Sequence, residues 1–343
     1  MNQLQIVSSM PPAHSAARTA NPAAELLHVE HTRAVTHVQL RRATKRNALN
    51  DALIERLRQV FTTLPPATRA VVLSGDGDHF CAGLDLSSLT ERSVVDGIAH
   101  SRSWHHAFEE IQFGRVPVVA VLKGAVVGGG LELASAAHIR VAEASTFYAL
   151  PEGQRGLFVG GGGSARIPRL IGAARMADMM LTGRVYAAEE GSRVGLSQYV
   201  VPEGAGLTTA FELAEKIASN AALSNFAVLH ALPRIAEMGQ SEGLFTESLM
   251  AAIAQGDDGA KTRMKAFLEG RAGKVRRADG HAAVAKPVKP AKPAKPAKPT
   301  KPTKPTKPTK AKAIGKTGKT GKTDKIAKTG KIAKTGKQAG AKK

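Results

Sequence analysis

The sequence predicts an α/β protein made of strand–strand–helix units, extended by a helical region and then by a long basic segment. Short apolar runs alternate with amphipathic segments up to about residue 205, whereas the segments that follow carry apolar residues at helical spacing. Beyond residue 285, large apolar side chains almost disappear. We therefore divide the chain into a flexible N-terminal arm, an α/β core, a helical C-terminal region and a disordered basic tail, at residues 1–23, 24–205, 206–272 and 273–343.

The basic character of the chain comes from its last segment. Residues 286–343 contain twenty lysines and one acidic residue, Asp324, and so carry +19 of the formal net charge of +21. Residues 1–285 are near neutral and long enough to bury a substantial core. The single cysteine, Cys81, excludes an intramolecular disulfide and fits a reducing compartment. No apolar stretch reaches the roughly 18 residues that span a bilayer, and the first residues lack a secretory pattern. We therefore expect a cytoplasmic protein.

The first strand–strand–helix unit occupies residues 25–64. Residues 25–42 alternate in polarity, as two strands joined by a short turn do. Asn50 is expected to cap the helix that follows, because its side-chain oxygen can accept a hydrogen bond from a free backbone N–H. Residues 70–74 form an apolar run typical of a short buried strand. The chain then enters a loop.

That loop, HFCAGLDLSSL at residues 79–89, is the first stretch that suggests chemistry. Gly83 permits backbone conformations that larger residues resist, so the N–H of Leu84 is expected to point into a pocket. Asp85 is expected to cap or brace the next turn. The helical pattern that follows carries His105-His106. Adjacent side chains on a helix point about 100° apart, so we interpret this pair as surface or packing histidines rather than metal ligands.

The central stretch is KGAVVGGGLELA, residues 123–134. An apolar strand at 116–122 leads into three glycines, and Glu132 follows where a helix is expected to begin. A glycine turn before a helix offers free N–H groups for an oxyanion, and a carboxylate beside them can act as an acid or base. The alternative is a tight turn followed by a solvated glutamate that the helix dipole favours.

A second carboxylate and a second glycine cluster follow. Glu152 comes directly after Pro151, at a loop start beside an expected strand end. Residues 160–163 are four consecutive glycines. The chain has neither a GxxxxGKS/T motif nor a GxGxxG turn within a strand-to-helix unit, so we do not expect nucleotide binding of those types. Residues 187–201 suggest a short helix, a turn and a strand, and amphipathic helices are expected at about 206–219, 222–237, 241–253 and 257–269.

Six separated motifs together resemble one family. Over roughly residues 24–272 the chain is similar to the enoyl-CoA hydratase/isomerase (crotonase) family. The matching stretches are KRNAL (45–49), HFCAGLDL (79–86), KGAVVGGGLELA (123–134), LPEGQRGLFVGGGGSARIPRLIG (150–172), LTGRVYAAEEGSRVGLSQYVVP (181–202) and AKTRMKAFLEGR (260–271). Their order and spacing make the combination more specific than any one motif.

This resemblance implies a right-handed spiral of strand–strand–helix repeats with a helical C-terminal region used in trimerisation, and trimers that pair into hexamers. It implies an acyl-CoA thioester as substrate, with no metal and no separate cofactor, because CoA is part of the substrate. The N–H groups of Leu84 and Gly129 would hold the thioester oxygen. Glu132 and Glu152 would be the acid/base pair. The resemblance also assigns the CoA channel to Lys45, Ala48, Ala82, Asp85 and Leu86.

The resemblance to this family predicts syn-type addition of water to a 2-enoyl-CoA, giving a 3-hydroxyacyl-CoA. Another crotonase reaction, such as double-bond isomerisation with one carboxylate, is the nearest alternative, and a nucleic-acid-associated protein on a hydratase scaffold is an alternative of another class. The chain departs from the usual pattern at Val159, where members commonly have proline, and at Gly270, where lysine is frequent. Leu84 is larger than the usual alanine, which puts the acyl chain length in doubt.

The tail repeats Lys-Pro-Ala and then Lys-Pro-Thr over residues 286–310. Such a composition cannot bury enough apolar surface to fold. It resembles the Lys/Pro/Ala tails of linker-histone-like bacterial proteins. Many lysines without aromatic residues favour sequence-indifferent binding to DNA, RNA or other polyanions, with steep salt dependence. This would allow association with the nucleoid, whereas the alternative is a merely solubilising tail.

Overall fold

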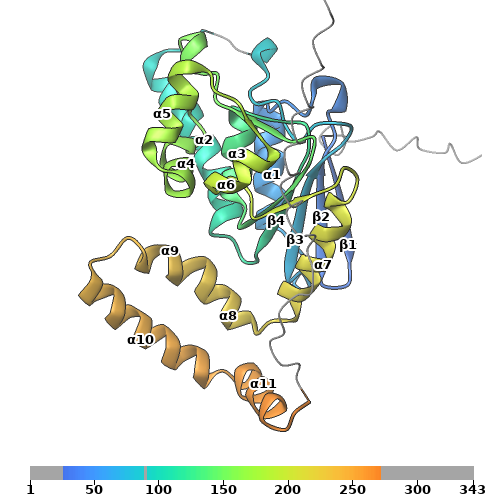
Figure 1. Ribbon diagram of the computed structural model, residues 1–343, viewed down its shortest axis with the longest axis vertical. Coiled ribbons are helices and arrows are strands. Elements are labelled where there is room, and N and C mark those ends of the chain that lie inside the picture. Colours follow the sequence, from blue (N-terminus) through green and yellow to red (C-terminus); the bar gives the residue numbers. More distant parts are fainter. Residues whose placement is uncertain (1–25, 89–90, 272–343) are drawn as a thin grey trace, which may run out of the picture. The chain divides into compact units, whose positions relative to one another are not determined.

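The structure, a computed structural model, describes residues 26–88 and 91–271. The predicted N-terminal arm at 1–23 and basic tail at 273–343 lie outside the described residues. The strands are β1 Leu27–Thr32, β2 Val35–Leu40, β3 Ala70–Gly75, β4 Val118–Leu122, β5 Ala125–Val127, β6 Ile139–Glu143, β7 Phe147–Ala149, β8 Tyr186–Ala187 and β9 Tyr199–Val201. The α-helices are α1 Asp51–Thr62, α2 Val94–Gln112, α3 Gly129–Ala136, α4 Gly163–Ile171, α5 Ala173–Thr182, α6 Ala188–Val194, α7 Gly206–Ser219, α8 Ala222–Phe226, α9 Leu232–Ile235, α10 Gln240–Gly256 and α11 Asp258–Leu268 (Figure 1).

The strands form two sheets. The larger sheet has the order β1-β2-β3-β4-β6-β9, antiparallel between β1 and β2 and parallel elsewhere. The smaller sheet has the order β5-β7-β8. Successive units place one strand in the larger sheet and the next strand in the smaller one, as β4 with β5 and β6 with β7 do. This is the predicted repetition of strand, strand and helix.

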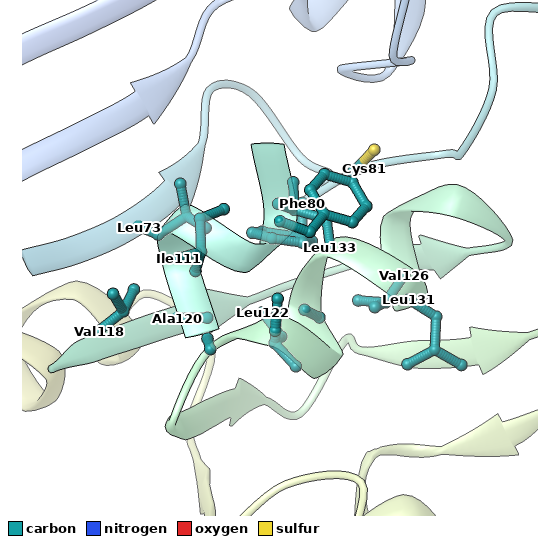
Figure 2. Packing of buried hydrophobic residues seen from close by; sticks show 14 of the residues in the cluster. Leu73, Phe80, Cys81, Ile111, Val118, Ala120, Leu122, Val126, Leu131 and Leu133 are labelled. Carbon is teal, nitrogen blue, oxygen red and sulfur yellow. The ribbon is translucent and has the colours of Figure 1, made fainter. Parts of the chain in front are cut away.

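Both faces of the central strands β3 and β4 are buried, which explains their continuous apolar runs. Leu73, Val118 and Ala120 point into the main core, where they pack near Phe80 and Ile111 (Figure 2). The alternate residues of β3 and β4 point to the opposite face, which α7 covers with alanines. Replacing an apolar residue on either face of these central strands with a charged one would therefore bury an unpaired charge.

Local sequence signals explain several element boundaries. The Asn50 side chain accepts a hydrogen bond from Leu53 N at 3.0 Å, which confirms the predicted N-cap of α1. Asp85 Oδ1 accepts hydrogen bonds from the backbone N and the hydroxyl of Ser87, so it braces the 3₁₀ turn η2, Leu86–Ser88. Gly83 has φ +94°, the left-handed backbone that favours glycine.

The structure differs from the sequence-based expectation at β5 and in the predicted helix at 222–237. The strand β5 was not expected, because its three residues lie between the Lys123-Gly124 turn and the glycines. The predicted helix at 222–237 is interrupted by a π-helical segment, η4 Ala227–Ala231, just before Pro233. Proline has no backbone N–H to donate, and a wider turn accommodates the lost hydrogen bond.

The C-terminal helices pack mainly on one another. α10 contacts α9, η4 and α11. Several large apolar side chains on this region are exposed, namely Phe226, Leu232, Leu244, Phe245, Leu249, Ile253, Phe267 and Leu268. In residues 26–88 and 91–271 no helix is long and apolar enough to cross a bilayer.

Candidate active site

The short strand β5 brings three sequence motifs together. On one side it pairs with β7, and on the other it forms a bridge with Cys81. Cys81 N donates to the Ala125 carbonyl oxygen at 3.0 Å, and Val127 N donates to the Cys81 carbonyl oxygen at 3.1 Å. Gly128 N donates to the Ala149 carbonyl oxygen at 2.9 Å. The loop after Cys81 and the loop after β7 therefore both meet the glycine turn that begins α3.

The backbone N–H groups of Leu84 and Gly129 lie close together. A Cβ built on Gly129 would be 3.5 Å from Leu84 N, and one on Gly83 would be 2.7 Å from the Val127 carbonyl oxygen. Glycine at position 83 therefore permits the close approach of the two loops. Among the described residues neither N–H has a hydrogen-bond acceptor. Gly129 begins α3, where the helix leaves its first N–H groups unpaired. Both donors are free to hold an oxygen atom of a ligand.

Glu132 lies in the first turn of α3 and is 3% exposed. Its Oε1 accepts two hydrogen bonds of 2.8 Å, from Gly161 N and Gly163 N. Burial raises the pKa of Glu132, the two N–H groups oppose that rise, and the negative charge of Glu152 adds to it. The net direction is upward. The two N–H donors hold the carboxylate in place and by themselves favour its ionised form, against the larger effect of burial.

Glu152 is half-buried and precedes the 3₁₀ turn η3, Gly153–Arg155. A Cβ built on Gly128 would lie 2.6 Å from its Oε1, so this carboxyl rests against the same glycine turn. Its Oε2 is buried and has no hydrogen-bond partner among the described residues. Burial raises the pKa of Glu152, partly opposed by the charge of Arg155. An unpartnered buried oxygen favours the protonated form.

One cavity of about 210 Å³ is lined by both free N–H donors and both glutamates. Helix α2 contributes Ser101 and Trp104 to its wall. Trp104 is 4% exposed and lies over the glycines, because a Cβ on Gly129 would be 3.1 Å from its ring. The cavity thus combines an oxyanion-type donor pair, two carboxyl groups and a bulky apolar wall.

The other residues predicted to contact CoA occupy two kinds of position. Ala82 and Leu86 line the cavity, and Leu86 is 47% exposed. Asp85 is buried and pairs with Arg42, whose Nη2 lies 2.7 Å from Asp85 Oδ2. Ala48 is also buried, and Arg42 donates to its carbonyl oxygen.

Lys45 is exposed, and its Nζ lies 3.3 Å from Ser87 Oγ. Lys45, Ala48 and Asp85 therefore support the loop or lie near it rather than lining the cavity, and their role with CoA stays a prediction.

The second glycine cluster is a functional feature that the sequence reasoning did not assign. The sequence indicates no phosphate loop there and places these glycines within a family-like motif, whereas the structure shows that N–H groups of the cluster donate to Glu132. The sequence feature that could have indicated this contact is the run of four consecutive glycines before a helix. Trp104 was also not singled out, because its helical spacing is the same as that of ordinary core residues. His105 of the predicted histidine pair lies 3.4 Å from Ser101 Oγ through its Nε2.

Known proteins resemble this chain in sequence and in fold. The sequence model described as enoyl-CoA hydratase/isomerase matches residues 30–276. Enoyl-CoA hydratase EchA19 of Mycobacterium tuberculosis is 31% identical over 240 residues, which cover 68% of this chain and 90% of that protein. A crystal structure from Rhodopseudomonas palustris, of a protein provisionally described as an enoyl-CoA hydratase, has 59% identity and a TM-score of 0.71, and covers 72% of this chain and 95% of that one.

A third relative is much longer than the matched region. The fatty acid oxidation complex subunit alpha of Shewanella amazonensis is 46% identical over 147 residues, which cover 42% of this chain and 21% of that protein. This chain therefore spans about a fifth of that relative.

The family match covers most of the chain, and the fold predicted from the six motifs is confirmed by the structure and by its solved neighbours. The chain belongs to the enoyl-CoA hydratase/isomerase family, the crotonases.

Proposed function

We propose that this chain is an enoyl-CoA hydratase that adds water to a 2-enoyl-CoA and yields a 3-hydroxyacyl-CoA. The observation that supports it is one cavity with two free N–H donors and two carboxyl groups that differ in their hydrogen bonds. Glu132 receives two N–H hydrogen bonds, whereas Glu152 has an unpartnered oxygen. This asymmetry suits an ionised base beside a protonated acid.

The proposed reaction proceeds as follows. The N–H groups of Leu84 and Gly129 hold the thioester oxygen and stabilise the charge that develops there; losing one such donor costs about 2.7–4 kcal/mol in comparable sites. Glu132 takes a proton from a water held between the two glutamates, and the water oxygen bonds to C3. The double-bond electrons move to the thioester oxygen. Glu152 then gives its proton to C2, and proton exchange between the carboxyl groups restores the starting state.

Glu132→Gln and Glu152→Gln test this mechanism. With crotonyl-CoA, followed by the absorbance of the conjugated thioester, each variant is expected to lose about 10²–10⁴-fold in kcat. Glu143→Gln is the matched control, since Glu143 is buried and accepts the Gly206 N–H at 3.1 Å, away from the cavity. Near-parental kcat in either glutamate variant would refute the two-carboxylate mechanism. A parental enzyme that converts 3-enoyl-CoA but does not hydrate 2-enoyl-CoA would support the isomerase alternative.

We also propose that the chain assembles as a trimer or a pair of trimers through its C-terminal helices. The exposed apolar side chains of α8–α11 support this, because contiguous apolar surface on a soluble protein marks an interaction site. Sedimentation of the wild-type chain and of Leu249→Glu, which places a charge on α10, tests the proposal. The variant is expected to sediment as a smaller species. An unchanged mass would exclude this surface from the interface.

For the tail we propose non-specific binding to polyanions such as DNA or RNA. Twenty lysines in residues 286–343 support it, because each neutralised phosphate releases a counterion. Deleting 286–343 is expected to leave hydratase activity intact and to abolish retention on DNA at low salt. In the full-length chain, retention should fall steeply as salt rises. Equal retention of DNA by the truncated chain would refute the proposal.

A further inference from the structure

The glycine turn, defined here as residues 160–163, is built to receive one carboxylate oxygen. Gly161 N and Gly163 N both donate to Glu132 Oε1 at 2.8 Å. A Cβ on Gly163 would lie 2.7 Å from Glu132 Cγ, and one on Gly161 would lie 3.3 Å from Glu132 Cδ. Glycine is therefore required at positions 161 and 163 for the turn to approach the Glu132 side chain this closely. Glu132 Oε2 has no hydrogen bond to the described residues, and its side chain lines the cavity.

Such a turn does not hold its own shape. Glycine has the largest backbone freedom of any residue, so a run of four needs external restraints to keep two N–H groups aimed at one oxygen. Two side chains supply them from outside the turn. Ser101 Oγ, on α2, donates to the Gly160 carbonyl oxygen at 2.6 Å. Arg166 Nη1, on α4, donates to the Gly161 carbonyl oxygen at 3.0 Å.

The Ser101 contact acts on the same peptide group that donates to Glu132. The carbonyl of Gly160 and the N–H of Gly161 belong to one peptide plane, and a hydrogen bond to that carbonyl polarises the N–H and strengthens its donation. The chain of contacts runs from Ser101 through this peptide to Glu132 Oε1.

Arg166 is itself anchored and partly buried. Its Nε donates to Gln112 Oε1 at 2.6 Å, at the end of α2. The charged groups around it are Glu132 and Glu109, with Arg102 and His105 nearby on α2, and Glu152 faces Glu132 across the cavity. Arg166 thus combines a hydrogen bond to the turn with a positive charge that acts on Glu132.

We propose that Ser101 and Arg166 are positioning residues for Glu132: they hold the glycine turn so that Oε1 stays bound and Oε2 is presented to the water. This inference rests on the proposed hydratase mechanism for its effect on rate. Its effect on the protonation of Glu132 is independent of the reaction. If the turn loosens, Glu132 loses the N–H groups and the positive charge that favour its ionised form, so it protonates at higher pH.

The test uses Ser101→Ala, Arg166→Gln and Arg166→Lys in the full chain, with crotonyl-CoA as substrate. The first two are expected to lose about 10–100-fold in kcat with KM little changed, because small misplacements of a catalytic group have effects of that size. The acidic limb of the kcat profile should move to higher pH. Arg166→Lys, which retains the charge, should recover part of the loss.

A second readout does not depend on activity. The infrared carbonyl band of the protonated Glu132 carboxyl, assigned by its disappearance in Glu132→Gln, should titrate at higher pH in Ser101→Ala and Arg166→Gln. Arg169→Gln is the control, since Arg169 lies on the same helix and pairs with exposed Glu237. It should match the parental enzyme in both readouts.

Folded Ser101→Ala and Arg166→Gln with parental kcat, pH profile and titration midpoint would overturn the proposal. Equal shifts in Arg169→Gln would also overturn it, since the effect would then belong to the helix as a whole. If Arg166→Gln fails to fold, Ser101→Ala decides, because it removes a single hydroxyl. A parental enzyme that hydrates no enoyl-CoA refutes the proposed function, and the infrared titration still decides the positioning role.

Discussion

Substituting Gly163 with alanine should disable the site without unfolding the protein. A Cβ at this position would lie 2.7 Å from Glu132 Cγ and 2.9 Å from its Oε1, whereas ordinary contact begins at 3.4 Å. The Glu132 side chain therefore has to move by about 0.7 Å, and it loses alignment with at least one of its two N–H donors. A displacement near 1 Å of a catalytic group costs on the order of 10²-fold in rate.

The effect on stability should be small. Gly163 is the first residue of α4. In a helix interior alanine is favoured over glycine by roughly 0.5–1 kcal/mol, and a gain of at most that size at this first position offsets part of the strain from the close contact. We therefore expect a small change in melting temperature and a large loss of kcat on crotonyl-CoA. This separation distinguishes misplacement of Glu132 from general damage to the fold.

Two other glycine variants sharpen the comparison. Gly160→Ala places a Cβ 3.8 Å from Ser101 Oγ, an ordinary contact, so it should lose much less activity than Gly163→Ala. Gly256→Ala, on α10, meets no atom within 4 Å and should have parental activity. A folded Gly163→Ala variant with parental kcat, or a Gly160→Ala variant that is equally inactive, would contradict this role of Gly163.

Two further predictions concern stability against pH. His138 is half-buried, and the desolvation of its ring lowers its pKa from 6.5 to about 4, so the unfolded chain binds a proton in this window that the folded chain does not. The free energy of unfolding should therefore fall as pH drops from 6.5 to about 4, with a slope of up to about 1.4 kcal/mol per pH unit from this group. Urea titrations of His138→Gln should show a weaker dependence of the unfolding free energy on pH in this window. Hydrogen bonds from Ser87 and then Arg42 hold the pKa of Asp85 at about 2, below its ordinary 3.8, so Asp85 stabilises the fold above pH 3.8 and this contribution is lost as pH falls through about 2. Asp85→Asn should be less stable at neutral pH, and a deficit that persists unchanged at pH 2 would contradict this.

The sequence predicts the main elements well where one signal dominates. Asn50 before α1 and the apolar runs of β3 and β4 are local features, and the structure has them where they were expected. The placement of Glu132 in a first helical turn and of Glu152 after a strand also followed from local pattern. These features depend on neighbouring residues, which a sequence shows directly.

Features that depend on contacts between distant segments were not predicted from pattern. The strand β5 is too short to have a period, and it exists because Cys81 and β7 pair with its two edges. The glycine turn gains its role from Glu132, which lies almost thirty residues earlier. Only the family resemblance predicts that Leu84 N and Gly129 N lie close together. The number of residues between them does not indicate their distance in space.

The pairing of β5 on both edges has a consequence for how such enzymes diversify. The donor loop and the loop of Glu152 are both tied by backbone hydrogen bonds to three residues, so their relative placement does not depend on the length of chain between them. Helix α2, which supplies Trp104 and Ser101 to the cavity wall, lies within one of those intervals. Insertions and substitutions there can reshape the cavity while the relative placement of the Leu84 and Gly129 N–H groups is kept.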